Sequence, residues 1–272
     1  MEEDEVSYEV TAFEEELKVS PLISEVAGKK VVLKGTVACP GCGPQLGLKV
    51  ALQLIDNCTL VTSSGCMRLI MKALSVPCFH GGLNAIAAAA GISKSTENTV
   101  LCFIGDGALS ANLGALQAAA ERNDNMICIC YNNQGYCNLN KPFQSITEFA
   151  RFVKAPYVAT AAISHLEDYI SKIKKASSMT GFRFIDLLSP CPVTMKIDSS
   201  NTMVVGKLAV ETGVWPLYEI VEGRLTVTEV LRKFEPIERY LEMLKTSVSD
   251  EEKLALQNRI KRKWKDLNNG CV

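Results

Sequence analysis

Two turns that each follow an apolar run carry side chains suited to binding a divalent cation. An apolar run at residues 99–104 leads directly into a Gly-Asp-Gly turn, in which Asp106 supplies a carboxylate. A second run at residues 126–131 leads into an Asn-Asn turn that ends at Asn133. Each turn alone is typical of an ordinary chain reversal. Together, a carboxylate and an amide oxygen are hard ligands of the kind that Mg²⁺ prefers, commonly beside phosphate, so the pair predicts a magnesium site.

Cysteines form the second candidate centre. Among the eleven cysteines, Cys39 and Cys42 make a C-x₂-C pair that opens a helical pattern, while Cys66 and Cys191 each follow a short apolar run. The C-x₂-C pair alone is compatible with a zinc site, a redox dithiol or half of an iron–sulfur site. Four cysteines without a neighbouring histidine suit a [4Fe–4S] cluster or a structural zinc. Because the last two are single and widely separated, the spacing favours the iron–sulfur cluster.

These side chains need a scaffold that gathers them, and the apolar runs predict a parallel β-sheet. Continuous apolar runs bounded by turn residues are typical of strands that are covered on both faces. Right-handed crossovers align the carboxyl ends of such strands at one edge, where open α/β sheets bind ligands. We therefore expect an α/β fold with a mostly parallel sheet and helices on both faces. The expected strands are residues 59–62, 99–104, 126–131, 157–160 and 182–188, with a hairpin near 214–223 and helices after Cys42, at 85–91, at 109–120, at 166–177 and beyond 237.

Other residues that could do chemistry fall into two groups. Cysteines inside expected strands pack as small hydrophobes. His80 is as compatible with a structural role as with substrate contact, and His165 is interpreted as structural. The polar loop after Asn133 is a better candidate, because loops at this edge of a sheet carry function; Asn138 is its first candidate and Cys137 its second. The cysteines assigned to the core are Cys58, Cys102, Cys128 and Cys130.

Length and charge exclude several classes of protein. With 272 residues and a formal net charge of −1, the chain can bury a large core and has no excess charge for nucleic acid or an anionic membrane. No apolar run approaches the roughly 18–20 residues of a membrane helix. The first residues lack the charged-then-apolar pattern of a signal peptide. We therefore expect a cytoplasmic protein whose thiols are reduced rather than disulfide-bonded.

Several short motifs together resemble one enzyme family. The Gly-Asp-Gly turn at residues 105–107 and the Asn-Asn pair at 132–133 are similar to the motif with which the thiamine-diphosphate fold binds Mg²⁺ and diphosphate. The cysteine segments at 38–43, 65–67 and 189–192 extend the likeness to the β subunit of 2-oxoacid:ferredoxin oxidoreductases, with the pyruvate branch as the nearest match. The resemblance covers nearly the whole chain. It implies one thiamine-diphosphate-binding domain over residues 1–272, with an N-terminal arm and a C-terminal helical extension.

The resemblance implies roles for particular residues. Asp106, the side chain of Asn133 and the carbonyl group of Gly135 match the Mg²⁺ ligands of the family. Asn138 matches an asparagine near the thiamine reaction centre and, together with Cys66, is implied to be catalytic. The implied cluster ligands are Cys39, Cys42, Cys66 and Cys191, and the implied cofactor-binding residues are Gly65, Cys66, Gly105, Asp106, Gly107, Asn133, Gly135 and Asn138.

The implied reaction is the oxidative decarboxylation of a 2-oxo acid, with pyruvate favoured, using thiamine diphosphate, Mg²⁺ and one [4Fe–4S] cluster. The thiazolium ring supplies the electron sink, coenzyme A takes the acyl group and ferredoxin takes the electrons. The implied partners are an α subunit with the pyrimidine-activating glutamate, and γ- and δ-type subunits with ferredoxin-like clusters. One departure leaves the identity of the oxo acid open: Asn138 is followed by Leu139 and Asn140, where the pyruvate branch has a threonine, and the segment from there to Tyr157 is short.

Two alternatives stay open on the sequence. A non-oxidative thiamine-dependent decarboxylase or synthase would use Asp106 and Asn133 but leave four cysteines without a role. A catalytically inert scaffold subunit held together by zinc would use the cysteines without the cofactor. A visible absorption spectrum separates them, because only an iron–sulfur cluster gives a broad thiolate-to-iron absorption that bleaches on reduction.

Overall fold

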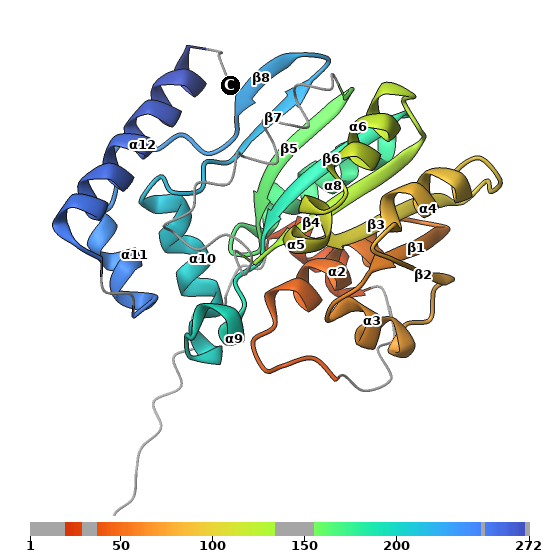
Figure 1. Ribbon diagram of the computed structural model, residues 1–272, viewed down its shortest axis with the longest axis horizontal. Helices are drawn as coiled ribbons and strands as arrows, with labels where there is room; N and C mark the ends of the chain where they lie inside the picture. Colours follow the sequence, from red (N-terminus) through yellow and green to blue (C-terminus); the bar gives the residue numbers. More distant parts are fainter. Residues whose placement is uncertain (1–19, 29–36, 134–154, 246–247, 270–272) are drawn as a thin grey trace, which may run out of the picture.

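An eight-stranded sheet forms the centre of the molecule in the part of the chain that the structure describes. This computed structural model describes residues 20–28, 37–133, 155–245 and 248–269. The strand order is β2-β1-β3-β4-β6-β5-β7-β8 (Figure 1). The first six strands are parallel, and β7 and β8 form an antiparallel hairpin that pairs with β5. The strands are β1 Cys58–Ser63, β2 Cys78–Gly82, β3 Thr99–Gly105, β4 Met126–Asn132, β5 Tyr157–Ala162, β6 Phe182–Leu188, β7 Tyr218–Val221 and β8 Arg224–Val227.

Five parallel strands confirm the positions predicted from apolar runs. β1, β3, β4, β5 and β6 extend the predicted ranges by at most two residues, and nearly every side chain in them is buried. β2 was not predicted, because its sequence, Cys-Phe-His-Gly-Gly, contains no apolar run. It is extended because it pairs with β1 along the outer side of the sheet. Tertiary pairing therefore decides the conformation of this segment, rather than local preference.

Helices cover both faces of the sheet, as predicted. One face is covered by α1, α2, α3 and α8, and the other by α4, α5 and α6. A third apolar cluster joins α10, α11 and α12 to the ends of β5 and β6. The bounds are α1 Pro21–Gly28, α2 Gly43–Leu54, α3 Met67–Ile70, the 3₁₀ turn η1 Met71–Ala73, α4 Ala85–Ile92, α5 Asp106–Ser110, α6 Leu113–Glu121, α8 Leu166–Ser178, α9 Pro192–Met195, the 3₁₀ turn η2 Ser199–Asn201, α10 Thr202–Glu211, α11 Ile237–Met243 and α12 Asp250–Asn268.

The crossover between β3 and β4 differs from its prediction in one respect. A continuous helix was expected at 109–120, but the structure has two helices, α5 and α6, separated at Asn112. The Asn112 side chain donates a hydrogen bond to the carbonyl oxygen of Ala108, 2.8 Å away, in place of a regular helical turn. Asparagine side chains compete with the backbone in this way, which explains the interruption. No helix in the described part of the chain is long and apolar enough to cross a membrane.

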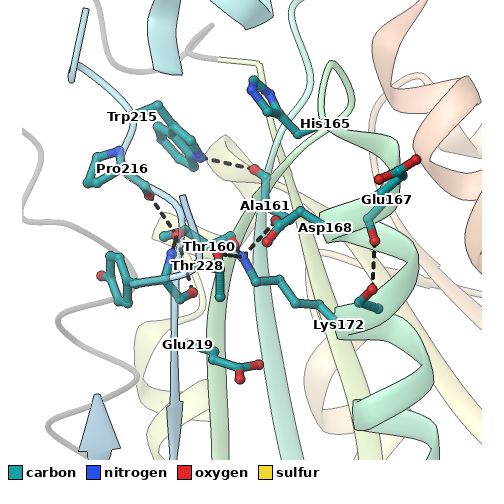
Figure 2. Close-up of polar contacts among 12 residues, drawn as sticks. Thr160, Ala161, His165, Glu167, Asp168, Lys172, Trp215, Pro216, Glu219 and Thr228 are labelled. Atoms are coloured by element: carbon teal, nitrogen blue, oxygen red, sulfur yellow. Dashed lines mark hydrogen bonds and ion pairs between the residues drawn. The ribbon is translucent and has the colours of Figure 1, made fainter. Parts of the chain in front are cut away.

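A buried polar network fastens α8 and the β7–β8 hairpin to β5 (Figure 2). The ammonium group of Lys172, whose side chain is 2% exposed, donates to the Thr160 carbonyl oxygen at 2.7 Å, to Asp168 Oδ2 at 2.7 Å and to Thr228 Oγ1 at 2.8 Å. Each of its three protons therefore has an acceptor. A buried ammonium group is tolerated only when it is paired, and here the pairing is complete, so the network has a structural role.

Candidate functional site

The predicted magnesium ligands lie at the ends of neighbouring strands. β3 and β4 are paired so that Gly105 is opposite Tyr131, which brings the residues after each strand to the same edge. Asp106 begins α5 directly after β3 and is 5% exposed, and its Oδ1 accepts a hydrogen bond from the Gly107 N–H at 3.0 Å. Asn133 follows β4 directly. The candidates Gly135, Cys137 and Asn138 lie outside the described residues.

Strand order adds an independent reason to look at this edge. β2 and β3 lie on opposite sides of β1. The connection from β1 to β2 runs through α3 on one face, whereas the connection from β2 to β3 runs through α4 on the other face. The sheet therefore has a topological switch point between β1 and β3, and ligands of open α/β sheets bind in the crevice at such a point. The turns with Gly65 and Cys66, after β1, and with Asp106, after β3, flank this crevice.

The C-x₂-C loop is seated against the loops at the same edge through two glycines. A Cβ atom at Gly43 would lie 2.5 Å from the Pro190 carbonyl oxygen, one residue before Cys191. A Cβ atom at Gly41, whose φ is +68°, would clash with the carbonyl oxygen of Ser199 in η2. Only glycine permits this approach, so the sequence Cys-Pro-Gly-Cys-Gly lets Cys39 and Cys42 reach the loop that carries Cys191.

One hydrogen bond fixes the C-x₂-C loop to the start of α10. Thr202 Oγ1 donates to the Gly41 carbonyl oxygen at 2.7 Å, across 161 positions of sequence. Thr202 is 5% exposed, so the contact is shielded from water. The loop is thereby fixed to α10 as well as to the loop after β6.

Electrostatic interactions link the four predicted cluster ligands. Burial raises the pKa of the Cys42 thiol to about 11, and the neighbouring Cys191, Cys66 and Cys39 raise it further, against the Gln45 backbone N–H, which lowers it. The four thiols are thus close enough for their charges to interact. They are not drawn to ligating distance: among the described residues, no three His, Cys, Asp or Glu side chains are arranged to hold a metal ion. Thiols that repel one another when ionised suit a cationic centre, so the donor set fits a metal or iron–sulfur group.

The remaining candidates are the cysteines assigned to the core and the two histidines. The core cysteines Cys58, Cys102, Cys128 and Cys130 are at most 4% exposed. His165 precedes α8 and its Nδ1 lies 3.0 Å from Ser164 Oγ, and burial lowers its pKa. His80 lies in β2, opposite Thr62 of β1, and its buried Nδ1 has no hydrogen-bond partner among the residues that the structure describes.

Sequence reasoning missed two residues of this edge. Thr202 carried no signal, because nothing in the sequence relates it to the C-x₂-C loop. Tyr131 was read only as the end of an apolar run, although it directly precedes the Asn-Asn pair. Its side chain is 4% exposed and lies between the turn after β1 and the turn after β3. An aromatic residue with a polar tip at a strand end was the available signal.

Comparisons with known proteins identify the fold and the family of this chain. Residues 73–187 match the family described as thiamine pyrophosphate enzyme, C-terminal TPP binding domain. The pyruvate synthase subunit PorB of Methanothermobacter marburgensis is 33% identical over 278 residues, which cover 86% of this chain and 96% of that protein. The ketoisovalerate oxidoreductase subunit VorB of Pyrococcus horikoshii is 28% identical, covering 86% of this chain and 91% of that protein.

A solved structure shows the same fold. A chain of the 2-oxoglutarate:ferredoxin oxidoreductase from Magnetococcus marinus superposes with a TM-score of 0.54, at 18% identity, over 83% of this chain and 93% of that chain. The likeness confirms the thiamine-diphosphate-binding fold predicted above. Since the PorB relatives match along almost their whole length, the chain belongs to the family of 2-oxoacid:ferredoxin oxidoreductase β subunits.

Proposed function

We propose that this chain is the thiamine-diphosphate- and [4Fe–4S]-dependent subunit of an enzyme that oxidatively decarboxylates a 2-oxo acid. Electrons pass to ferredoxin and the acyl group passes to coenzyme A. The observation that carries the proposal is the close approach of the C-x₂-C loop to the loop of Cys191, where Cys39, Cys66 and Cys191 influence the Cys42 thiol, at the edge of the sheet that also carries Asp106. A thiamine enzyme without electron transfer has no use for these thiols. Pyruvate is the favoured substrate because relatives named as pyruvate synthase subunits match most of the chain.

In this proposal, oxygen atoms at the ends of β3 and β4 hold Mg²⁺. The ligands are the Asp106 carboxylate, the Asn133 side chain and the Gly135 carbonyl group. Support comes from the position of Asp106 and Asn133 after paired strands and from the burial of Asp106, which a carboxylate tolerates when it binds a cation. Mg²⁺ neutralises charge on the diphosphate. Gly105 and Gly107 let the backbone approach the diphosphate group closely.

The four cysteines, Cys39, Cys42, Cys66 and Cys191, hold the cluster in this proposal. Because burial and like charges raise the pKa of Cys42, its thiolate is disfavoured near neutral pH, and a bound cation would favour it. Cys66 also directly follows Gly65, at the switch point of the sheet. In this arrangement Gly65 and Cys66 would lie beside both the cluster and the thiazolium ring, so the path for electrons between the two would be short.

Thiamine diphosphate, when bound, supplies the electron sink for decarboxylation. The chain's own contribution is to bind and orient it with Gly65, Cys66, Gly105, Asp106, Gly107 and Asn133, and to place Asn138 near the reacting atoms. The names of the relatives imply an assembly of several subunits. We propose an α subunit that supplies the pyrimidine-activating glutamate, and γ- and δ-type subunits that carry electrons onward to ferredoxin.

Iron content and visible absorption of the assembled complex test this proposal. The chain is co-expressed with its partner subunits and purified without oxygen, as wild type and as Cys66→Ser and Cys102→Ala. Wild type and C102A are expected to show a broad visible band that bleaches on reduction. C66S is expected to lose the iron and the absorption that this chain's cluster contributes, while those of the partner subunits remain, and to keep its far-ultraviolet circular dichroism. C102A is the matched control, because Cys102 is fully buried within β3.

Three results would contradict parts of the proposal. Zinc in place of iron in the wild type would favour a zinc-held scaffold subunit. Full iron content in C66S would remove Cys66 from the ligand set. Decarboxylation of 2-oxo acids with no reduction of ferredoxin would favour a non-oxidative thiamine enzyme. A panel of 2-oxo acids, including pyruvate and ketoisovalerate, then identifies the substrate.

A further inference from the structure

The side chain of Tyr131 connects the two halves of the candidate site. It is the penultimate residue of β4, is 4% exposed, and lies opposite Gly105 of β3. Its ring stacks on that of Phe103, with centroids 5.1 Å apart and an angle of 25° between the planes. Two buried rings stacked in this way hold each other in place, so the position of the hydroxyl group is fixed by the core of the sheet.

The hydroxyl oxygen lies between the turn that carries Cys66 and the turn that carries Asp106. A Cβ atom at Gly105 would come within 2.8 Å of Tyr131 Oη, and a Cβ atom at Gly65 would come within 3.3 Å of it. Both turns therefore approach the same oxygen, each at a glycine directly before a proposed ligand. The tyrosine fills the space that these two glycines leave.

The polar neighbours of this hydroxyl belong to the same two turns. It makes a hydrogen bond with the Ser63 hydroxyl, and Cys66 and Asp106 are among its electrostatic neighbours. Ser63 is fully buried at the end of β1, and its Oγ accepts a hydrogen bond from the Gly105 N–H, with 3.5 Å between nitrogen and oxygen. Ser63 therefore links the same two turns.

We infer that the Tyr131 hydroxyl is a positioning group that holds the Cys66 turn against the Asp106 turn and stabilises negative charge on the Cys66 sulfur. The inference rests on the proposed function, in which Cys66 binds the cluster and Asp106 binds Mg²⁺. Reduction adds one negative charge to the cluster. A hydroxyl group close to the turn of a ligand sulfur favours that added charge, and polar groups near the sulfurs are one of the factors that set the reduction potential.

The reduction potential of the cluster tests this role. Tyr131→Phe removes only the oxygen and keeps the stacked ring. The complex is purified without oxygen, and its iron content is measured. A reductive titration followed by electron paramagnetic resonance gives the midpoint potential of this chain's cluster, which is identified as the signal that C66S lacks. We expect full iron content in Y131F and a potential lower than in wild type. Loss of a merely structural contact would not move the potential in this way.

Tyr157→Phe is the matched control. Tyr157 is a fully buried tyrosine whose hydroxyl donates to Glu219 Oε2 at 3.1 Å, and it lies at the opposite, amino-terminal end of β5. Y157F loses a buried hydrogen bond of similar kind, but it is expected to keep the wild-type potential. A shift in Y131F that Y157F shares would overturn the inference.

The remaining outcomes are also decisive. A wild-type complex in which this chain carries no cluster would contradict the proposed function and therefore this inference as well. A wild-type cluster together with an unchanged potential in Y131F overturns the inference alone. If Y131F fails to assemble, Ser63→Ala replaces it, because it removes the partner of the hydroxyl and leaves the ring untouched. A changed potential in S63A then supports the role of Tyr131, and an unchanged one refutes it.

Discussion

Two buried regions of this molecule handle charge in opposite ways. On the flank formed by α8, β5 and the β7–β8 hairpin, the Lys172 ammonium meets a carboxylate, a carbonyl and a hydroxyl oxygen (Figure 2). Burial lowers the pKa of Lys172, and Asp168 counteracts this. At the carboxyl edge, by contrast, the neighbours of the Cys42 thiol are three more thiols, which raise its pKa instead of compensating for burial.

The difference distinguishes a buried network that stabilises the fold from a cluster of side chains that we propose to bind a ligand. Opposite charges that pair inside a protein satisfy one another and leave no capacity for a ligand. Groups of like charge gathered at one place oppose their own ionisation, which is typical of functional sites. The flank is complete in the protein alone, whereas in our proposal the edge is completed by a cation. Variants on each side should therefore fail in different assays.

The largest effect is expected from the glycine that seats the C-x₂-C loop. Gly41→Ala places a methyl group against the Ser199 carbonyl oxygen and should abolish cluster incorporation. Gly223→Ala is the matched control, because Gly223 also has a positive φ, +82°, but an added Cβ there would have nothing within 4 Å. G223A should lose only about 1 kcal/mol to backbone strain and keep its iron. Equal iron content in the two variants would refute the seating of the loop.

Two equally buried aspartates, Asp106 and Asp124, allow the next test of the difference between the two kinds of region. Asp106→Ala should weaken Mg²⁺-dependent binding of thiamine diphosphate to the assembled complex by at least the roughly 100-fold that losing an outer-shell partner costs. Asp124, which is equally buried, pairs with Lys94 and Arg122 before β4. Asp124→Ala should lower the midpoint of urea unfolding but leave cofactor affinity unchanged. Unaltered cofactor affinity in D106A, measured by calorimetry, would remove Asp106 from the metal site.

A variant of Lys172 tests the opposite case, in which stability is lost and the candidate site is kept. Lys172→Met leaves the Asp168 carboxylate and two oxygen acceptors without their shared donor and should lower the free energy of unfolding by about 2 kcal/mol. Chemical denaturation measures this loss. Iron content and cofactor affinity of the folded protein should match wild type. A variant that is as stable as wild type but lacks the cluster would reverse the assignment of the two regions.

The smallest effect concerns pH. Burial lowers the pKa of His165 below its ordinary value of 6.5, against the raising influence of Glu229 and Asp168. The unfolded chain therefore takes up this proton first, and the stability that the neutral imidazole contributes is lost as the pH falls through the unfolded pKa. His165→Asn should remove this part of the decline between neutral and mildly acidic pH. Parallel stability curves for the two proteins would contradict the prediction.

The fold was largely predictable because its strands are continuous apolar runs. β3 and β4 are apolar along nearly their whole length, which favours burial on both faces, and β6 is apolar except for Arg183 and Asp186. β2 could not be predicted, because only its pairing with β1 makes Cys78–Gly82 extended. The break at Asn112 likewise depends on one side-chain hydrogen bond that competes with the helix.

The candidate site was predictable in its residues but not in its supports. Asp106, Asn133 and the cysteines lie on turns after strands, so parallel topology alone brings them to one edge. The contacts of Thr202 with Gly41 join positions 161 residues apart and follow from no local pattern. The place of Tyr131 between two turns depends on the register of β4 with β3, which an apolar run does not specify.

The order of the strands also affects how this chain can fold during its synthesis on the ribosome. β6 lies between β4 and β5, although it follows both in sequence. A nascent chain that has released β1 to β5 therefore still lacks the strand that unites them, and two apolar strand edges stay open until residue 188 has emerged. Such unpaired edges are prone to aggregate, so the protein is expected to depend on chaperones during its synthesis.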